Sequence, residues 1–409
     1  MNEKYNKYDV IIIGGGYAGC VTAICCARER LKVAIFEKND KLCRKLLSTG
    51  NGRCNFSNEI INDNCYYSNS DIAGIIPKDS YKDSICFLNS IGVREKSING
   101  YLYPYTNQAK TIRDAIEIAV SDLSIDVYLN TQVDNIVSQK ESFIVSGCNL
   151  KFSSTHVVMA TGSCAAPQIG GSDLGYKLAN DLNIKLTDIH PALVGLLSND
   201  SRLKHLSGVR CHGKVSWQTA SFEGEIQFNK DGISGYPVMC LSRIITASLT
   251  DSAKLIIDFL PDDTTENIKK ELTQRIINNG HSKSIHECMI GLLNDKCIDV
   301  ILWDKHIAID TPSSNITISD IDLIVKSIKS FSLKIKSSKG YESAQVAAGG
   351  VDLKQIDLIT MESITYPNMY FIGEILDIDG ICGGYNLEWA RLSASRASKR
   401  IINKHNDSN

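Results

Sequence analysis

The chain has 409 residues, of which 43% are hydrophobic and 22% are charged, and its formal net charge is -2. This length supports two or three domains with large cores. The near-neutral charge gives no global field that attracts nucleic acid, so we expect no nucleic-acid partner. The 14 cysteines are scattered without a CxxC pair, which argues against a metal site or thioredoxin-type chemistry and fits a reducing compartment.

The first forty residues have the pattern of a dinucleotide-binding βαβ unit. The apolar run Tyr8–Ile13 leads into the glycine-rich stretch Gly14–Gly19, and a helix is predicted from about Ala18 to Arg30. A second apolar run then ends at Glu37, 23 residues after Gly14. Glu37 is therefore placed to accept hydrogen bonds from the hydroxyls of a ribose.

Each glycine of this fingerprint has a distinct physical task. Gly14 permits the tight turn after the strand, Gly16 lets the backbone approach a pyrophosphate, and Gly19 lets the helix pack closely on the strand. The free N–H groups at the start of the helix would face the phosphates. The segment therefore predicts a site for an adenine dinucleotide.

The apolar stretch from Val10 to Ala27 could be mistaken for a signal peptide or a membrane span. Three consecutive glycines are unfavourable in such a helix, and the stretch ends in charged residues, at Arg28-Glu29-Arg30. The βαβ pattern also continues beyond it. We therefore expect a soluble, cytoplasmic protein with no membrane partner.

The pattern of the whole chain predicts an α/β fold with an inserted module. Residues 1–190 and 344–409 are expected to form a discontinuous nucleotide-binding domain, with a last strand at 369–374 and a final helix over about 386–399. Short alternating runs predict an antiparallel β subdomain from residues 191–262 and 330–343. Residues 263–329 are expected to form a helical subdomain.

Two later glycine motifs favour FAD over NAD as the tightly held cofactor. Ala160-Thr161-Gly162 ends a buried strand, where the chain can pass close to a cofactor. Gly373-Glu374 and Gly383–Asn386 precede the last helix, whose N-terminus can stabilise negative charge on a flavin. The stretch Gly170–Gly175 lacks the second glycine of the fingerprint, so we expect no separate nicotinamide-binding domain.

These motifs resemble those of the BaiN/YhiN-like flavoprotein family, which is also described as NAD(P)/FAD-dependent oxidoreductases or aminoacetone oxidase family FAD-binding enzymes. The blocks that carry the resemblance span most of the chain: Gly14–Gly19, Arg44–Asn55 (RKLLSTGNGRCN), Gly232–Gly235, Ala348–Val351, Thr360–Ser363 and Tyr370–Asn386. The resemblance implies a two-motif FAD-binding Rossmann-type domain with an inserted antiparallel, barrel-like β domain and a small helical domain.

The resemblance also implies which residues lie near the isoalloxazine ring. Gly50 to Cys54 are expected to approach one edge, and Gly384 to Asn386 the other. The chain departs from the family pattern at Glu388 and Arg391, where Gln and an aromatic residue are common, and also after Gly162. Because several departures lie near the expected substrate side, they bear on the substrate that the resemblance implies and not on the cofactor.

The residues predicted to bind the cofactor come from all of these segments. They are Gly14, Gly16, Tyr17, Ala18, Gly19, Glu37, Lys38, Arg44, Lys45, Gly50, Asn51, Gly52, Arg53, Cys54, Val133, Ala160, Thr161, Gly162, Gly373, Glu374, Gly384, Tyr385 and Asn386. Arg44, Lys45 and Arg53 could bind the phosphates, orient the flavin or bind a substrate carboxylate. A solvated basic loop is the alternative.

The candidate proton donors are tyrosines. Reduction of an enone requires a hydride at one carbon and a proton at the other, and Tyr236 and Tyr385 are the predicted catalytic residues. Cys382 and His190 are weaker candidates. The aromatic run Tyr101-Leu102-Tyr103-Pro104-Tyr105 could line a flat pocket or anchor a buried loop.

We therefore predict an FAD-dependent oxidoreductase that takes electrons from NAD(P)H and acts on a small-molecule substrate. The expected reaction is reduction of a conjugated C=C in an enone of a steroid-like or bile-acid-like kind, which the resemblance implies. One alternative is a flavin amine oxidase that takes aminoacetone-like substrates and passes electrons to oxygen. Another is a non-catalytic, flavin-bound module that binds RNA or protein.

Overall fold

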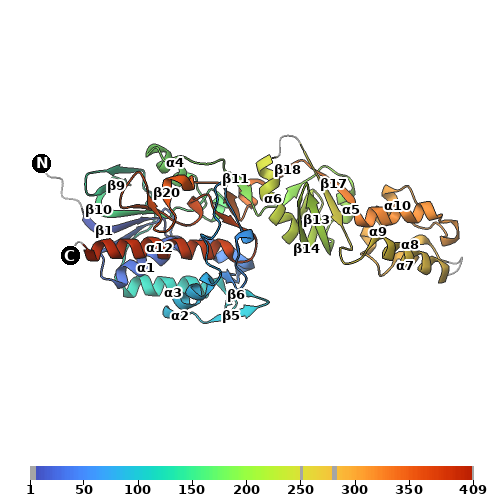
Figure 1. The fold of residues 1–409 in the computed structure, drawn as a ribbon, viewed down its shortest axis with the longest axis horizontal. Coiled ribbons are helices and arrows are strands. Elements are labelled where there is room, and N and C mark those ends of the chain that lie inside the picture. The colour runs from blue at the N-terminus through green and yellow to red at the C-terminus, as the bar shows by residue number, and fades with distance from the viewer. Residues whose placement is uncertain (1–5, 249–251, 279–282, 408–409) are drawn as a thin grey trace. The chain divides into compact units, whose positions relative to one another are not determined.

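The computed structural model describes residues 6–248, 252–278 and 283–407, and it divides into two compact units (Figure 1). Unit 1 comprises Met1–His190 and Gln345–Asn409, and unit 2 comprises Pro191–Ala344. Each unit has its own hydrophobic core. The finer division of unit 2 into a β and a helical subdomain stays a prediction.

The centre of unit 1 is a parallel sheet built on the N-terminal strand. Strand β1 (Asn6–Ile13) lies between β10 (Leu150–Met159) and β2 (Val33–Phe36), and it pairs with both in parallel. The sheet continues to β22 (Met369–Phe371) on one side and β7 (Asp126–Tyr128) on the other. The carboxyl ends of β1, β2, β10 and β22 therefore meet at one edge, where ligands of open α/β sheets bind.

Smaller elements complete the strands of unit 1. They are the sheet extensions β20 (Ile356–Asp357), β21 (Glu362–Ser363), β8 (Asn135–Ser138) and β9 (Phe143–Gly147), the three-stranded sheet of β3 (Ser57–Asn58), β6 (Tyr101–Pro104) and β5 (Glu95–Ile98), the pair of β4 (Tyr66–Tyr67) with β23 (Asp379–Gly380), and β19 (Val346–Ala348). The short strand β11 (His190–Ala192) spans the point in the sequence where unit 2 begins.

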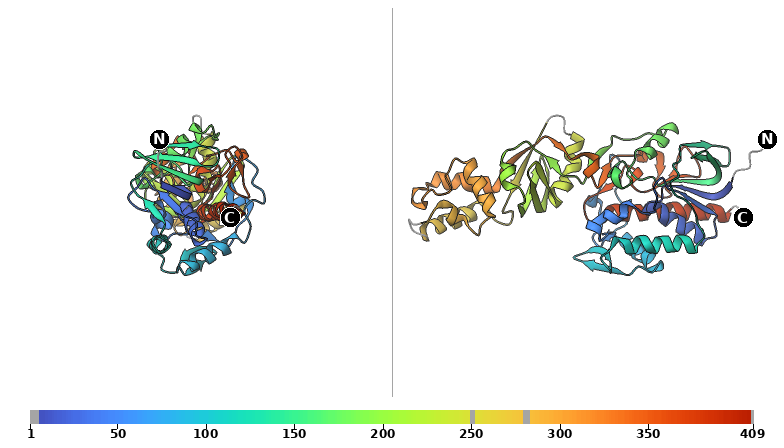
Figure 2. Two further views of the ribbon diagram at one scale, coloured as in Figure 1. Left: turned by 90° about the vertical axis from the view of Figure 1, so that its left-hand side faces the viewer. Right: turned by 180° about the vertical axis from the view of Figure 1, so that it is seen from behind.

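Helices cover the sheet of unit 1 and exclude water from it. Helices α1 (Tyr17–Arg28) and α12 (Tyr385–Asp407) lie side by side on one face, with α3 (Ala109–Asp122) beyond them (Figures 1 and 2). The inner residues of β1 are fully buried, as expected for a parallel strand covered on both faces. The remaining helices of this unit are α2 (Ser80–Ser90) and α4 (Leu174–Asp181).

Unit 2 contains an antiparallel sheet with the strand order β17-β16-β13-β14-β15-β12-β18. The two strands at the ends of this order come from one continuous segment, Phe331–Ile335 and Ser337–Ser338, with only Lys336 between them. The segment pairs with β16 at one end and with β12 at the other. The sheet therefore closes on itself, which confirms the expected inserted barrel-like domain.

The other elements of unit 2 are regular strands and short helices. The strands are β12 (Leu196–Leu197), β13 (Arg210–Trp217), β14 (Ala220–Asn229), β15 (Gly232–Gly235) and β16 (Ala253–Asp258), and the helices are α5 (Arg202–Leu206), α6 (Tyr236–Ser248), α7 (Thr265–Asn278), α8 (Ile285–Met289), α9 (Asp295–Asp304), α10 (Ile318–Lys329) and α11 (Gly340–Ser343). No helix in the described ranges combines the length and apolarity needed to cross a bilayer.

Three predicted element boundaries were wrong. The last strand of the sheet ends at Phe371 rather than Glu374, because Gly373 adopts a left-handed backbone (φ 70°) that starts a short 3-10 turn. The final helix extends to Asp407 rather than ending near residue 399. Residues 236–248, expected within the β subdomain, form α6, which buries apolar residues at helical spacing, among them Val238, Leu241 and Ile245.

A buried ion pair fixes α12 against the elements beneath it. Glu388 and Arg391 are 0% and 1% exposed, and the Arg391 guanidinium donates to the Glu388 carboxylate. The hydroxyls of Ser57 and Ser84 donate to Glu388 Oε2 at 2.6 and 2.5 Å. Arg391 also donates to the carbonyl of Ser80 at 2.8 Å. The pair thus joins α12 to α2 and β3.

Removing one partner of this pair should destabilise unit 1 strongly. We expect Arg391→Met to lower the free energy of unfolding by about 3–5 kcal/mol, because it leaves the Glu388 carboxylate buried and unpaired. The double variant Glu388→Gln/Arg391→Phe should recover most of the loss, because it leaves no buried charge. Urea unfolding followed by circular dichroism measures both. A loss below about 1 kcal/mol for Arg391→Met would contradict this account.

Candidate functional site

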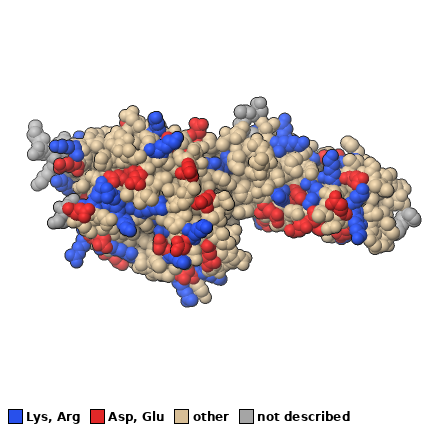
Figure 3. All heavy atoms as spheres, in the orientation of Figure 1, with Lys and Arg blue, Asp and Glu red and all other residues tan. Residues whose placement is uncertain are grey.

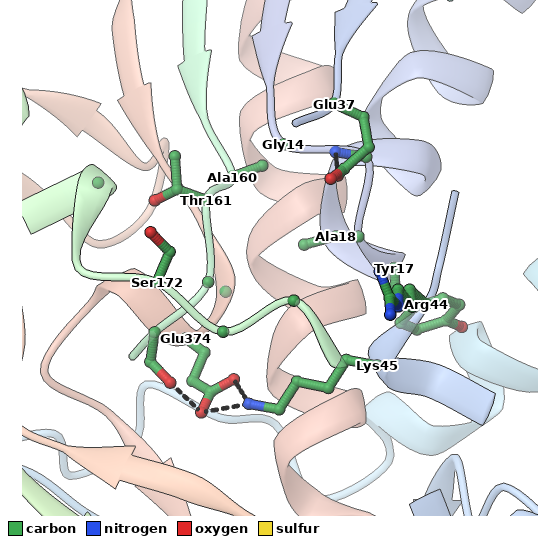
Figure 4. A pocket seen from close by; sticks show the side chains of 18 of the residues that line it. Gly14, Tyr17, Ala18, Glu37, Arg44, Lys45, Ala160, Thr161, Ser172 and Glu374 are labelled. Carbon is green, nitrogen blue, oxygen red and sulfur yellow. Dashed lines mark hydrogen bonds and ion pairs between the residues drawn. The ribbon is translucent and has the colours of Figure 1, made fainter. Parts of the chain in front are cut away.

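A cavity at the carboxyl edge of the central sheet collects most of the predicted cofactor residues (Figure 4). The predicted residues that line it are Gly14, Gly16, Tyr17, Ala18, Glu37, Lys38, Arg44, Lys45, Val133, Ala160, Thr161, Gly162, Gly373, Glu374 and Asn386. These residues come from segments separated by more than 350 positions in the sequence. The fold therefore brings all three glycine motifs to one cavity.

The glycines of the first motif divide into two that are tightly packed and one that is open. A Cβ on Gly14 would lie 2.3 Å from the carbonyl oxygen of Ala160, and one on Gly19 would lie 2.1 Å from the carbonyl oxygen of Gly14. A Cβ on Gly16 would meet nothing within 4 Å. Gly14 and Gly19 thus allow close packing, whereas Gly16 faces open space in the cavity wall.

The start of α1 is suited to bind an anion. The helix begins at Tyr17, and its N-cap Gly16 makes no side-chain capping hydrogen bond. Its first turn contains no acidic residue. Backbone N–H groups at a helix start have no partner within the helix and carry the positive end of the helix dipole. A pyrophosphate at the open face of Gly16 would satisfy these groups.

Glu37 holds the glycine turn from the end of β2. Its Oε2 accepts a hydrogen bond from the backbone N–H of Gly15 at 2.8 Å, and its Oε1 accepts from the backbone and side-chain N–H groups of Asn39 at 2.8 and 2.6 Å. The carboxylate is only 7% exposed but lines the cavity. Because each carboxylate oxygen accepts more than one hydrogen bond, Glu37 can also accept from a ribose hydroxyl.

A second carboxylate, Glu374, lies at the opposite end of the cavity in the close-up view (Figure 4). Lys45 Nζ lies 2.8 and 3.1 Å from its two oxygens, and Ser163 Oγ donates to Oε1 at 2.7 Å. The backbone N–H of Ala347 donates to the same oxygen at 3.2 Å. This cluster joins the loop that contains Lys45 to the segment that contains Glu374. The Glu374 carboxylate and the Ser163 hydroxyl are polar groups that can bind the hydroxyls of a ligand.

One cavity residue, Thr161, has a buried hydroxyl without a partner among the described residues. A Cβ on Gly175 would lie 1.9 Å from Thr161 Oγ1, so α4 approaches this hydroxyl as closely as only a glycine permits. Because an unpaired buried hydroxyl is costly, a polar ligand that binds it would be favoured. The open face at Gly16, the carboxylates and this hydroxyl together fit FAD.

Several predicted residues do not line this cavity: Gly19, Gly50, Asn51, Gly52, Arg53, Cys54, Gly384, Tyr385 and, in unit 2, Tyr236. Thr49 lines the cavity, and the two residues that follow it, Gly50 and Asn51, are exposed and adopt left-handed backbone angles. Burial raises the pKa of the Cys54 thiol to about 12, so this cysteine is protonated at neutral pH. The Tyr385 hydroxyl donates to the carbonyl of Ile60 at 3.0 Å. Their proposed functional roles stay predictions.

The cavity also contains residues that the sequence did not single out. These include Asn39, Cys43, Thr131, Ser163, Gly171, Gly175, Gln345, Val346, Leu387 and Ala390. Of these, only the residues between Gly170 and Gly175 could have been predicted from the sequence, because this glycine-containing stretch closely follows the Ala160-Thr161-Gly162 motif. A Cβ on Gly171 would lie 2.0 Å from the carbonyl oxygen of Ala165, so this glycine is required for the turn.

Comparisons with known proteins agree with this architecture. The family model described as HI0933-like protein Rossmann domain matches residues 8–400. A 3-dehydro-bile acid delta(4,6)-reductase of Clostridium scindens is 31% identical over 93% of this chain and 95% of its own. A ribosomal RNA dihydrouridine synthase of Escherichia coli is 26% identical over 97% of this chain and 98% of its own.

A solved structure of the same fold is a 3-ketosteroid-delta4-(5alpha)-dehydrogenase of Rhodococcus jostii, determined with 4-androstene-3,17-dione. It is 13% identical, covers 98% of each chain and has a TM-score of 0.52. At this identity the likeness concerns the fold alone. It agrees with the predicted fold class.

The open face at Gly16 should matter for ligand binding and not for stability. We expect Gly16→Ala to leave the unfolding free energy of the apoprotein within about 0.5 kcal/mol of wild type, because the backbone at Gly16 (φ -73°) suits any residue and the added Cβ meets no atom. Its affinity for FAD should fall at least about tenfold, because the Cβ occupies space next to the helix start.

Gly19→Ala is the matched control, because its Cβ would clash with the backbone of Gly14. This variant should unfold at a lower urea concentration. Titration of the apoproteins with FAD, followed by quenching of flavin fluorescence, compares the affinities. Wild-type affinity in Gly16→Ala would show that the cofactor does not bind at the start of α1.

Proposed function

The chain belongs to the HI0933-like protein family and is an FAD-dependent oxidoreductase, and we propose that it reduces a C=C bond conjugated with a carbonyl group. The electrons would come from NAD(P)H, the substrate would be a small molecule of a steroid-like kind, and the reaction would take place in the cytoplasm. The relatives support this chemistry. One is named as a reductase of a dehydro-bile acid, and another as a synthase of dihydrouridine. Uridine also carries its reducible C=C next to a carbonyl group.

The observation that supports the proposal most directly is that all three glycine motifs line one cavity, in which Glu37 and Glu374 lie at opposite ends. When bound, FAD supplies an N5 atom that accepts and donates hydride. The N–H groups at the start of α1 would hold the pyrophosphate, and Glu37 would bind the ribose. Glu374, held by Lys45 and Ser163, would accept hydrogen bonds from hydroxyls further along the cofactor.

The residues near the start of α12 would serve the flavin end of the cofactor. Asn386 lines the cavity in the first turn of that helix, and its side-chain amide donates to and accepts from the backbone of Gly380. The positive end of the helix dipole favours negative charge there. This environment would stabilise a reduced, anionic flavin ring.

The two candidate proton donors differ in their surroundings. The Tyr385 hydroxyl is buried and donates its proton to a backbone carbonyl, so transfer of that proton to a substrate would first break this bond. Tyr236, the first residue of α6, is half-buried. We propose Tyr236 and Tyr385 as the proton donors to test first. Tyr236→Phe should lower the rate of enone reduction and leave flavin reduction by NAD(P)H unchanged.

The amine oxidase and the non-catalytic binding module predict different flavin behaviour. An amine oxidase would be reduced by aminoacetone and reoxidised by oxygen. On the face drawn in Figure 3, acidic and basic side chains are interspersed over both units. This distribution gives no support to a module that binds the RNA backbone.

Anaerobic stopped-flow spectroscopy distinguishes these functions. We expect NADH or NADPH to bleach the visible absorbance of the bound flavin, and a steroid enone to restore it without oxygen. The saturated ketone of the same steroid is the control and should restore nothing, because it offers no conjugated C=C. Bleaching by aminoacetone instead of NAD(P)H would favour the oxidase, and bleaching by neither would contradict the proposed reaction.

A further inference from the structure

The tyrosine run of β6 carries two stacked arginines. Tyr101 and Tyr103 occupy alternate positions of β6, so their side chains share one side of the strand, and Tyr105 follows its last residue, Pro104. The guanidinium carbon of Arg53 lies 5.0 Å from the ring centroid of Tyr103, and that of Arg94 lies 4.6 Å from the centroid of Tyr105. We call these five residues the tyrosine–arginine face.

Both arginines of this face retain free hydrogen-bonding capacity. Among the described residues, the guanidinium of Arg53 makes one hydrogen bond, from its Nε–H to the carbonyl of Gly50 at 3.4 Å. Within the described ranges, neither Arg53 nor Arg94 has a carboxylate within 4.0 Å, whereas Lys45 is paired with Glu374. The stacking orients the planar guanidinium of Arg53 without using its terminal N–H groups. Such a fork is preorganised to bind a carboxylate through two hydrogen bonds.

The face adjoins one end of the cavity. Thr49 lines the cavity, and the backbone N–H of Cys54 donates to its carbonyl at 3.0 Å, so the turn that carries Arg53 begins at the cavity wall. On the other side, Tyr101 Cε1 lies 3.3 Å from the position that a Cβ on Gly383 would take, three residues before the cavity residue Asn386.

The turn that carries Arg53 has a well-defined conformation. Gly50 and Asn51 both have a φ of 55°, in the left-handed region. A Cβ on Gly50 would lie 2.9 Å from the backbone nitrogen of Asn55, so the turn packs directly on the segment that leads to β3. The hydroxyl of Thr49 donates to the carbonyl of Leu46 at 2.6 Å. Arg53 is therefore presented by a fixed loop rather than by a loose one.

We propose that the tyrosine–arginine face binds the substrate and that Arg53 is the specificity-determining residue, which anchors a carboxylate on a flat enone. The inference rests on the proposed function and further specifies that the substrate carries a negative charge. Tyr105, which is 55% exposed, and the partly exposed Tyr101 offer apolar surface for the ring system. The guanidinium of Arg53, which lies over the buried ring of Tyr103, binds the carboxylate at the edge of that ring system. An uncharged enone of the same shape binds more weakly because it leaves the guanidinium without its partner.

The test compares a 3-oxo-4-ene steroid that carries a side-chain carboxylate with its methyl ester. Both are titrated into the oxidised, FAD-loaded protein, and binding is followed by the change in flavin absorbance and by calorimetry. We expect Arg53→Met to weaken binding of the carboxylate about 10- to 100-fold and binding of the ester by less than about twofold. The affinity of Arg53→Lys for the carboxylate should lie between those of wild type and Arg53→Met, because lysine keeps the charge but lacks the paired N–H donors of the guanidinium.

Lys140→Met is the matched control, because it removes an exposed positive charge from the turn between β8 and β9 of the same unit. It should bind both steroids as the wild type does. Equal binding of acid and ester by wild type, or equal losses for both in Arg53→Met, would overturn the inference. Loss of FAD from Arg53→Met would also overturn it, because Arg53 would then serve the cofactor.

A uridine-containing oligoribonucleotide, titrated into the same proteins, examines the competing class of ligand. If Arg53→Met weakens binding of the oligonucleotide but of neither steroid, the face binds nucleic acid and the inference fails. These binding measurements do not depend on turnover. The proposed function fails separately, if wild-type protein binds the carboxylate steroid but its reduced flavin is not reoxidised by it.

Discussion

The structure of unit 1 depends on the close approach of three backbone segments at the ends of β1 and β10. Gly14 leaves no room for a Cβ beside the carbonyl of Ala160, and Gly19 leaves none beside the carbonyl of Gly14. This packing draws α1 onto the sheet and points its first turn at the space above the strand ends. Gly16 faces that space, and a Cβ added to it would meet nothing within 4 Å. The same contacts thus pack the core and leave the cavity open at the start of α1.

The other end of the cavity depends on residues far apart in the sequence. Lys45 and Glu374 are 329 positions apart and form an ion pair there. The position of Glu374 depends on the short turn after β22, and the adjoining helix α12 is held by the buried pair of Glu388 and Arg391. A buried ion pair adds little net stability but is costly to break, so it favours one arrangement of these elements.

Local patterns in the sequence predicted the part of the site that local packing determines. The fingerprint from Gly14 to Gly19 and the acid Glu37 lie where their spacing indicated, because one βαβ unit sets their geometry. The roles of Ser163 and Gln345 in the wall could not be predicted in this way, because they depend on contacts between distant segments. Helix α6 was missed because the short alternating runs on either side of it dominated the pattern.

The loop from Gly50 to Cys54 shows a further limit of sequence patterns. Its glycine-rich composition suggested contact with the cofactor, which stays a prediction. Thr49 lines the cavity, and the two residues that follow it, Gly50 and Asn51, both adopt left-handed backbone angles. The same turn places Arg53 on the ring of Tyr103. Composition could identify the loop as special, whereas its direction follows from backbone angles that the sequence pattern does not specify.

The central claim is that the cavity binds the whole of an adenine dinucleotide and not only a flavin. The most direct measurement is calorimetric titration of apoprotein with FAD, with FMN and with ADP. The account predicts that FAD binds one to one and at least about a hundredfold more tightly than FMN, because FMN lacks the adenosine that Glu37 would bind. It also predicts that ADP competes with FAD. Equal affinity for FMN and FAD, without competition by ADP, would contradict it.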